Sequence, residues 1–209
     1  MTWKIGSLAG IVLLGTVAVA RLLQDPDTGT ASWDAARSAG FASYLLLWAS
    51  MVTGMAVHLR FRAAGGPLTV LLELHRVTSV LALSFVAAHV LGLLVDPVVR
   101  FSMLDAVAPF TSDYRPLQVG AGTIAEWLLV AVLATTATAA RLPYAAWRRV
   151  HFLSFPCFAL ALVHGITSGT STGNTLALSL YTATAAALAA MLVVRVAGRG
   201  WVTAGETTG

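Results

Sequence analysis

Four of the five histidines in this chain form two pairs with nearly equal spacing. His75 precedes His89 by fourteen residues, and His151 precedes His164 by thirteen. All four lie in long apolar segments, where an ionisable side chain is costly and is therefore usually functional. Neutral imidazole is a good ligand for iron. The pattern predicts that these histidines bind metal, although a single histidine in such a segment can instead hydrogen-bond a neighbouring helix.

The elements that position the histidines are predicted to be membrane-spanning helices. Hydrophobic residues make up 57% of the 209 positions and charged residues only 11%, which is outside the usual range for a soluble domain. Six apolar stretches are each long enough to cross a hydrocarbon core of about 30 Å as a helix. They run approximately over residues 5–23, 38–58, 70–95, 118–140, 148–168 and 175–196. We therefore expect an all-α integral membrane protein, with residues 1–209 forming a single six-transmembrane-helix bundle in the cytoplasmic membrane.

The distribution of lysine and arginine predicts that both termini are cytoplasmic. Nine of the thirteen basic residues fall on one side of the predicted helices, which the positive-inside rule assigns to the cytoplasm. These nine are Lys4, Arg60, Arg62, Arg76, Arg141, Arg148, Arg149, Arg195 and Arg199. The first stretch also fits a cleaved signal peptide, because Lys4 and a short apolar run precede the sequence Ala18-Val19-Ala20. Cleavage would leave five helices with the same orientation.

The four histidines are expected at two depths, because the third and fifth stretches run in the same direction. His75 and His151 then lie near the cytoplasmic end, and His89 and His164 near the outer end. The helical rise separates the two depths by about 20 Å, a spacing that suits two stacked haems between the third and fifth helices. Two imidazoles fill both axial positions of each iron, so the expected task is outer-sphere electron transfer.

The helical phase of His151 and His164 predicts a distortion between them. Fourteen residues bring His75 and His89 to within about 40° of each other, whereas thirteen leave His151 and His164 about 140° apart on an ideal helix. Pro156 lies between the latter two, and proline removes a backbone hydrogen bond. We expect a 3₁₀-like or bent segment around residues 152–157.

Basic and aromatic residues beside the inner histidines are candidates for supporting roles. Arg76 and Arg148, with Arg149, lie next to His75 and His151 in the sequence and suit the carboxylates of haem propionates. Their alternative role is that of positive-inside anchors. Trp147 is interpreted as part of the interfacial aromatic belt, with contact to the inner haem as the alternative.

Three features nearer the outer side and the helix ends complete the candidates. Glu126, in the outer half of the fourth stretch, is expected either to relay protons near the outer haem or to be a structural carboxyl group. His58 is interpreted as an interfacial residue, with a role near the inner haem as the alternative. The connection over residues 96–116 has an apolar side that suits a lid on the membrane surface, and a solvated loop is the alternative. Its apolar residues are Phe101, Met103, Leu104, Val107 and Phe110.

Several other chemistries are not supported by the sequence. The basic residues are spread over short loops and form no clustered face, so we expect no nucleic-acid partner. The single Cys157 permits neither a disulfide framework nor a CxxC metal site. Neither a G-x-G-x-x-G fingerprint nor a P-loop is present, so flavin or NAD(P)H chemistry is expected only through a separate partner.

The motifs around the histidines resemble a known family. The segments LHRVTSVLALSFVAAHV and WRRVHFLSFPCFALALVHG are similar to the ferric reductase-like transmembrane domain shared by ferric reductases and NADPH oxidases. The segment LDAVAPFTSDYRPLQVGAG resembles the outer loop of bacterial single-domain members. The resemblance covers about residues 33–196 and implies that His75 and His151 ligate an inner haem b, and His89 and His164 an outer one. Because the given sequence continues only briefly after the last predicted helix, we expect no flavin or NADPH domain of the kind that the reductases carry.

Together these observations favour a membrane subunit that moves electrons across the bilayer. The expected donor is a cytoplasmic flavoprotein or a quinol, and the expected acceptor is extracytoplasmic, as in a ferric reductase. One alternative is the haem-binding subunit of a periplasmic methionine sulfoxide reductase system, and a quinol-oxidising cytochrome b is another. A haem-free transporter or assembly protein is the alternative from a different class.

Overall fold

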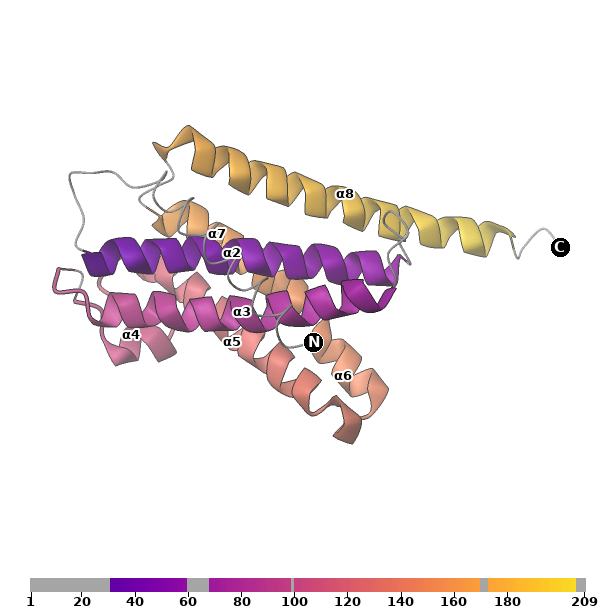
Figure 1. Cartoon of the computed structure of the whole chain (residues 1–209), viewed down its shortest axis with the longest axis horizontal. Helices are drawn as coiled ribbons and strands as arrows, with labels where there is room; N and C mark the ends of the chain where they lie inside the picture. The colour runs from indigo at the N-terminus through magenta and orange to yellow at the C-terminus, as the bar shows by residue number, and fades with distance from the viewer. Residues whose placement is uncertain (1–30, 60–67, 99, 170–172, 206–209) are drawn as a thin grey trace.

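The computed structural model of the protein describes residues 31–59, 68–98, 100–169 and 173–205, and within these ranges all regular structure is helical (Figure 1). The helices are α2 Ala31–His58, α3 Leu68–Leu94, α4 Met103–Val107, α5 Pro116–Ala137, the 3₁₀ turn η2 Ala139–Arg141, α6 Tyr144–His151, α7 Ser154–Ser168 and α8 Thr175–Gly205. Five stretches are long and apolar enough to cross a membrane, one of them formed by α6 and α7 together. The prediction of an all-helical, multi-pass membrane protein is confirmed. The helix predicted over residues 5–23 lies outside the described residues, so the count of six stays a prediction.

Helix α8 ends at Gly205, well after its predicted end at residue 196, and α2 begins well before its predicted start. Hydropathy placed this start near residue 38, whereas the helix begins at Ala31. Asp34 and Arg37 fit the additional turns because they lie three residues apart and form an ion pair at 3.6 Å. Ser38 Oγ also donates to the Asp34 carbonyl oxygen at 2.7 Å. These local side-chain interactions therefore stabilise additional helical turns in a polar segment, which a hydropathy pattern does not predict to be part of the helix.

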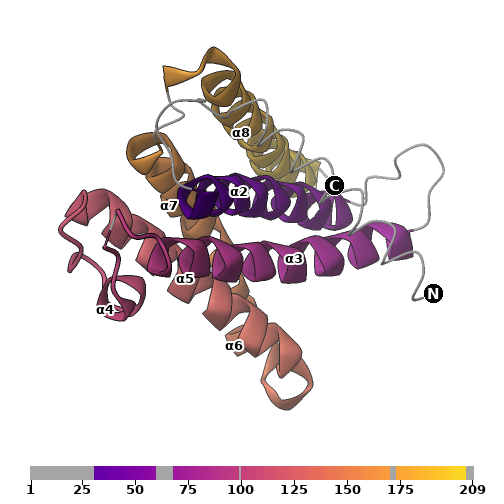
Figure 2. The same ribbon diagram turned by 60° about the vertical axis from the view of Figure 1, so that its left-hand side comes forward.

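The long helices run up and down in alternation (Figures 1 and 2). Helix α2 packs along α3, and α5 packs along α7, and these are the two most extensive contacts between elements. Lesser contacts join α2 to α7 and α3 to α5, and α8 lies on the outside against α2 and α7. Helices α3 and α7, which carry three of the four paired histidines, have at most a marginal contact with each other. The histidines therefore project into the space between two helix pairs.

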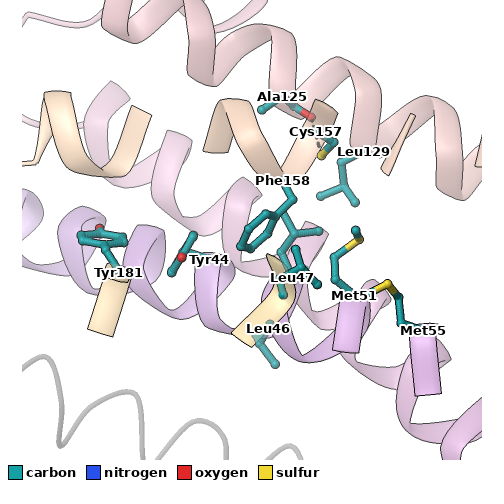
Figure 3. Close-up of a cluster of buried hydrophobic side chains, with 12 residues drawn as sticks. Tyr44, Leu46, Leu47, Met51, Met55, Ala125, Leu129, Cys157, Phe158 and Tyr181 are labelled. Atoms are coloured by element: carbon teal, nitrogen blue, oxygen red, sulfur yellow. Dashed lines mark hydrogen bonds between the residues drawn. The ribbon is translucent and has the colours of Figure 1, made fainter. Parts of the chain in front are cut away.

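A buried aromatic cluster holds the helix pairs together (Figure 3). Phe158 of α7 stacks on Tyr44 of α2 with ring centroids 5.6 Å apart, and Tyr181 of α8 contacts Tyr44 edge-on at 4.9 Å. The hydroxyl group of Tyr44 bonds to that of Thr184 on α8. Cys157 is buried next to Phe158 and donates from Sγ to the Ala125 carbonyl oxygen of α5 at 3.3 Å. Cys157 and Phe158 lie midway along the chain between His151 and His164, so this cluster fixes α7 between the two histidine levels.

The predicted break between the last two histidines is present. Helix α6 ends at His151, two turn residues follow, and α7 begins at Ser154. Leu153 N–H donates to the Val150 carbonyl oxygen at 2.9 Å and Phe155 N–H to the Phe152 carbonyl oxygen at 3.2 Å, which are bonds of 3₁₀ type. Pro156 has no N–H with which to bond the Phe152 carbonyl oxygen in the α-helical manner. The prediction of a distorted segment over residues 152–157 is confirmed, and the single helix predicted over residues 148–168 is divided into two.

Candidate cofactor-binding site

The structure brings the four histidines together in two pairs. The rings of His75 and His151, called the first pair, have centroids 5.9 Å apart and planes at 71°. The rings of His89 and His164, called the second pair, have centroids 6.2 Å apart and planes at 78°. Each pair joins one histidine of α3 to one on the α6–α7 segment, across the space that these helices leave between them.

The spacing within each pair fits two imidazoles on opposite sides of one metal ion. A histidine nitrogen lies about 2.0–2.1 Å from a bound first-row metal, and the ring centroid lies about 1.1 Å further away, so two opposed rings have centroids about 6.3 Å apart. The observed separations are close to this value. Within the described residues, no group of three or more His, Cys, Asp and Glu side chains is placed to hold a bare metal ion. A site with two histidines suits a metal whose other ligands come from a cofactor, as the porphyrin supplies them to iron in haem.

Three of the four histidine rings rest on glycines. A Cβ atom added to Gly40 of α2 would lie 2.8 Å from His89 Nδ1, and one added to Gly122 of α5 would lie 2.6 Å from His164 Nδ1. At Gly54 of α2 the corresponding distance to His75 Cε1 is 3.0 Å. Since real Cβ atoms essentially never approach a neighbour closer than 3.0 Å, only glycine admits the rings of His89 and His164 in these positions.

Each of these glycines is accompanied by a hydrogen-bond acceptor four residues earlier. His89 Nδ1 lies 2.7 Å from the Ala36 carbonyl oxygen, His75 Nδ1 lies 2.9 Å from that of Ser50, and His164 Nδ1 lies 2.8 Å from that of Gln118. We call a glycine together with the carbonyl oxygen four residues before it a seat. The seats of α2 hold both histidines of α3, and the seat of α5 holds the histidine of α7.

The seats determine which ring nitrogen is available to a metal. A carbonyl oxygen can only accept, so Nδ1 of each seated histidine must carry the proton and donate. The lone pair is then on Nε2, which is the arrangement of a neutral histidine that ligates metal through Nε2. Such a hydrogen bond also fixes the ring orientation and raises the basicity of the ligand. In each seated imidazole, Nε2 is therefore the atom that is chemically suited to ligate a metal.

His151 is held differently. Its Nδ1 is buried without a hydrogen-bond partner in the described part of the chain. Its ring instead stacks on Trp147, one turn earlier in α6, with centroids 5.0 Å apart and planes at 28°. Trp147 Nε1 in turn donates to Thr136 Oγ1 at 3.3 Å, next to the end of α5. The first pair thus consists of one seated and one stacked histidine.

A cavity with a volume of about 200 Å³ surrounds the second pair. His89, His164 and the seat glycines Gly40 and Gly122 line it. Arg37 lines the same cavity with its guanidinium group paired to Asp34, and its side chain is only 19% exposed. A half-buried guanidinium group beside the histidines is suited to a carboxylate-bearing cofactor. The cavity also extends to Phe101 of the connection between α3 and α5.

The predicted lid region is partly helical. Ser102 and Asp105 form a capping box at the start of α4, and hydrogen bonds from the Ser102 side chain and then its backbone lower the pKa of Asp105. Trp127 Nε1 donates to the Val107 carbonyl oxygen at 2.9 Å, so α4 is tied to α5 beside the cavity. Except for Phe101, which lines the cavity, the predicted apolar side is exposed. Its exposed members are Met103, Leu104, Val107 and Phe110.

The other predicted site residues lie around the pairs. Arg76 is largely exposed and forms a loose surface pair with Glu73 at 3.9 Å, and Arg148 lies over the Phe152 ring at 5.6 Å. Glu126 lines the cavity of the second pair, on the same face of α5 as Gly122. His58 is exposed at the end of α2 and belongs to neither pair.

Sequence reasoning missed Arg37 and the seats. One signal for the seats was present, since Gly40 and Gly54 are fourteen residues apart, as are His89 and His75. Two antiparallel helices with equal spacings bring both glycines to the levels of both histidines. Gly122 offers no such repeat, because α5 carries a single seat. Arg37 lies just outside the stretch predicted over residues 38–58, so hydropathy gave no sign that it shares a helix with Gly40.

Comparison with known proteins gives one family. The profile described as "Ferric reductase like transmembrane component" matches residues 37–167, which is more than half of the chain. The matched segment contains all four paired histidines and the glycines of all three seats. Neither a curated protein nor a solved structure shows a significant match.

Proposed function

Because the chain belongs to the ferric reductase-like transmembrane component family, which implies a membrane cytochrome, we propose that it is a di-haem b-type electron carrier. His75 and His151 would ligate the iron of one haem, and His89 and His164 that of the other. The observation that carries the proposal is the presence of two imidazole pairs, each with the ring separation expected for two axial ligands. When bound, the haems supply one-electron redox chemistry, and the protein sets their position and surroundings.

The described residues would hold the haems and exclude other ligands. The seats of Gly40, Gly54 and Gly122 hold three imidazoles through Nδ1, so their Nε2 atoms would ligate the iron. Arg37 would pair with a propionate of the haem between His89 and His164. Arg76 and Arg148 are the corresponding candidates for the other haem, and Glu126 is a candidate proton carrier in the cavity.

The direction of transfer follows from the charge distribution. Arg76 follows His75 on α3, and Arg141, Arg148 and Arg149 belong to η2 and to α6, the helix that ends at His151. The end of the bundle with the first pair is therefore proposed to be cytoplasmic. An electron moving outward from a negative cytoplasm gains about 2.3 kcal/mol per 100 mV of membrane potential. The protein would accept electrons from a cytoplasmic flavoprotein or a quinol and pass them to an extracytoplasmic acceptor, as the electron-transfer subunit of a transmembrane oxidoreductase.

Absorption spectroscopy of the purified protein tests the proposal. The dithionite-reduced minus oxidised spectrum should show b-type bands, and the pyridine haemochrome assay should give two haems per chain. Replacement of His75 and of His89 by alanine, one at a time, should each remove one haem. Purified, folded protein without b-type bands after expression with excess haem would refute the proposal and favour a haem-free transporter or assembly protein.

A further inference from the structure

Two serines connect the His75 ring to its own backbone. The Ser50 hydroxyl oxygen of α2 lies 3.1 Å from His75 Nδ1 and 2.6 Å from the Ser79 hydroxyl oxygen of α3. Ser79 Oγ donates to the His75 carbonyl oxygen at 2.6 Å. Both serines are buried, so water does not compete for these hydrogen bonds. We call Ser50 and Ser79 the serine bridge.

The directions of these hydrogen bonds follow from the carbonyl oxygen at the end of the bridge. A carbonyl oxygen can only accept, so the single proton of the Ser79 hydroxyl group points to His75. Ser79 Oγ then accepts the proton of Ser50, which leaves the Ser50 oxygen with lone pairs toward His75 Nδ1. The Nδ1 proton is therefore shared between this oxygen and the Ser50 carbonyl oxygen at 2.9 Å. Because each hydrogen bond in a chain polarises the next, the Ser50 hydroxyl oxygen is a stronger acceptor than an isolated one.

The four histidines differ in the acceptors around Nδ1. His89 and His164 each have a carbonyl oxygen, at 2.7 and 2.8 Å, and Ser168 Oγ lies 3.3 Å from His164 Nδ1. His151 Nδ1 has no hydrogen-bond partner among the residues that the structure describes. Carbonyl oxygens alone would therefore give the second pair two such hydrogen bonds and the first pair only one.

This difference matters for the reduction potential of a metal that the histidines ligate. A hydrogen bond from Nδ1 raises the basicity of the ligand, and a more basic ligand stabilises ferric over ferrous iron. With one such bond fewer, the first pair would give its haem the higher potential. The electron that the proposed function sends outward would then be retained at the first pair.

We infer that Ser50 and Ser79 lower the reduction potential of the haem ligated by His75 and His151. The inference rests on the proposed function and deepens it by naming positioning residues that act through His75. The bridge gives the first pair a second acceptor in place of the one that His151 lacks. The hydrogen bond between the two serines also joins α2 to α3, and hydroxyl groups between membrane helices often serve only that purpose. A reduction potential distinguishes the two roles, because helix packing alone does not set it.

Potentiometric titration of the purified, haem-loaded protein, followed by absorbance, tests the inference. Ser50→Ala should shift the equilibrium of one haem about three- to tenfold toward the ferrous form, which is the contribution of roughly one hydrogen bond. For a one-electron couple this shift raises the midpoint potential by about 30–60 mV. The other haem should keep its potential, and His89→Ala should remove this unshifted component. The spectra of two low-spin haems in electron paramagnetic resonance would verify that ligation is preserved.

Further variants test whether the serines act as one unit. Ser79→Ala should give a smaller shift of the same sign, because the Ser50 oxygen remains but loses the partner that polarises it. Ser50→Ala combined with Ser79→Ala should shift the potential no further than Ser50→Ala alone. Thr78→Val is the matched control, since Thr78 is buried next to Ser79 on α3. Its hydroxyl group donates to the Leu74 and His75 carbonyl oxygens, at 2.7 and 3.2 Å, and both potentials should be unchanged.

The outcomes distinguish this inference from the proposed function. An unchanged potential in Ser50→Ala protein that binds two haems would overturn the inference and assign the serines to helix packing. A lower potential would also overturn it, because ferric haem carries the greater positive charge and is favoured when a loosened site admits water. Additive shifts in the double variant would contradict a bridge that acts as one unit. Protein that contains no haem would instead refute the proposed function.

Discussion

Substitution of Gly122 by alanine is the sharpest test of the seats. The added Cβ atom would lie 2.6 Å from His164 Nδ1, whereas ordinary contact begins at 3.4 Å, so the ring must move by 3.4 − 2.6 = 0.8 Å. The Gln118 carbonyl oxygen belongs to the same helix and is 2.8 Å from Nδ1, so the displacement lengthens this hydrogen bond to roughly 3.6 Å, beyond its useful range.

The expected loss of haem affinity follows from these two effects. The lost hydrogen bond corresponds to about 1 kcal/mol, and the overpacking to about 1–3 kcal/mol. The sum, roughly 2–4 kcal/mol, would weaken binding of the haem that we propose between His89 and His164 by a factor of roughly 30 to 1000. The haem between His75 and His151 should be unaffected, because Gly122 does not contact its ligands.

The assay is the haem-to-protein ratio of the purified variant. We expect the ratio to fall from two toward one for Gly122→Ala. Gly173→Ala is one control, since a Cβ atom there meets nothing within 4 Å. A folded Gly122→Ala protein with two haems and an unaltered spectrum would refute the role of the seat.

Three further predictions concern individual residues. His89→Ala should remove one of two haems and leave the other spectroscopically intact, whereas simultaneous loss of both would contradict independent sites. His58→Ala should leave haem stoichiometry unchanged, since His58 is exposed and outside both pairs; a halved haem content would assign it a ligand role. The lowered pKa of Asp105 means that its capping contribution is present above the ordinary carboxyl pKa of about 4 and is lost as pH falls through the folded value. Amide exchange in α4, corrected for intrinsic rates, should therefore rise at low pH, and Asp105→Asn should abolish this dependence.

The two depths of the histidines and the break between α6 and α7 could be predicted from the sequence, because both depend on helical geometry alone. Fourteen residues nearly complete four turns, and thirteen do not, so the distortion near Pro156 had to exist if His151 and His164 face the same space. The start of α2 was not accessible, because hydropathy does not register the pairing of Asp34 with Arg37. The carbonyl oxygens of the seats could not be predicted either. Every residue has a carbonyl oxygen, and only the packing of the helices selects those that accept a hydrogen bond from a histidine.

The different environment of His151 has a physical origin in α5. On α2 the two seat glycines are fourteen residues apart, and the same interval along α5 from Gly122 leads to Thr136. A second seat of the same kind would require glycine at position 136, where threonine carries a branched side chain. Thr136 Oγ1 instead accepts a hydrogen bond from Trp147, and the indole ring of Trp147 occupies the place between α5 and His151. The tryptophan thus substitutes for the missing seat, and because its other neighbour is the exposed Tyr144, the histidine without a seat is also the one connected to the surface.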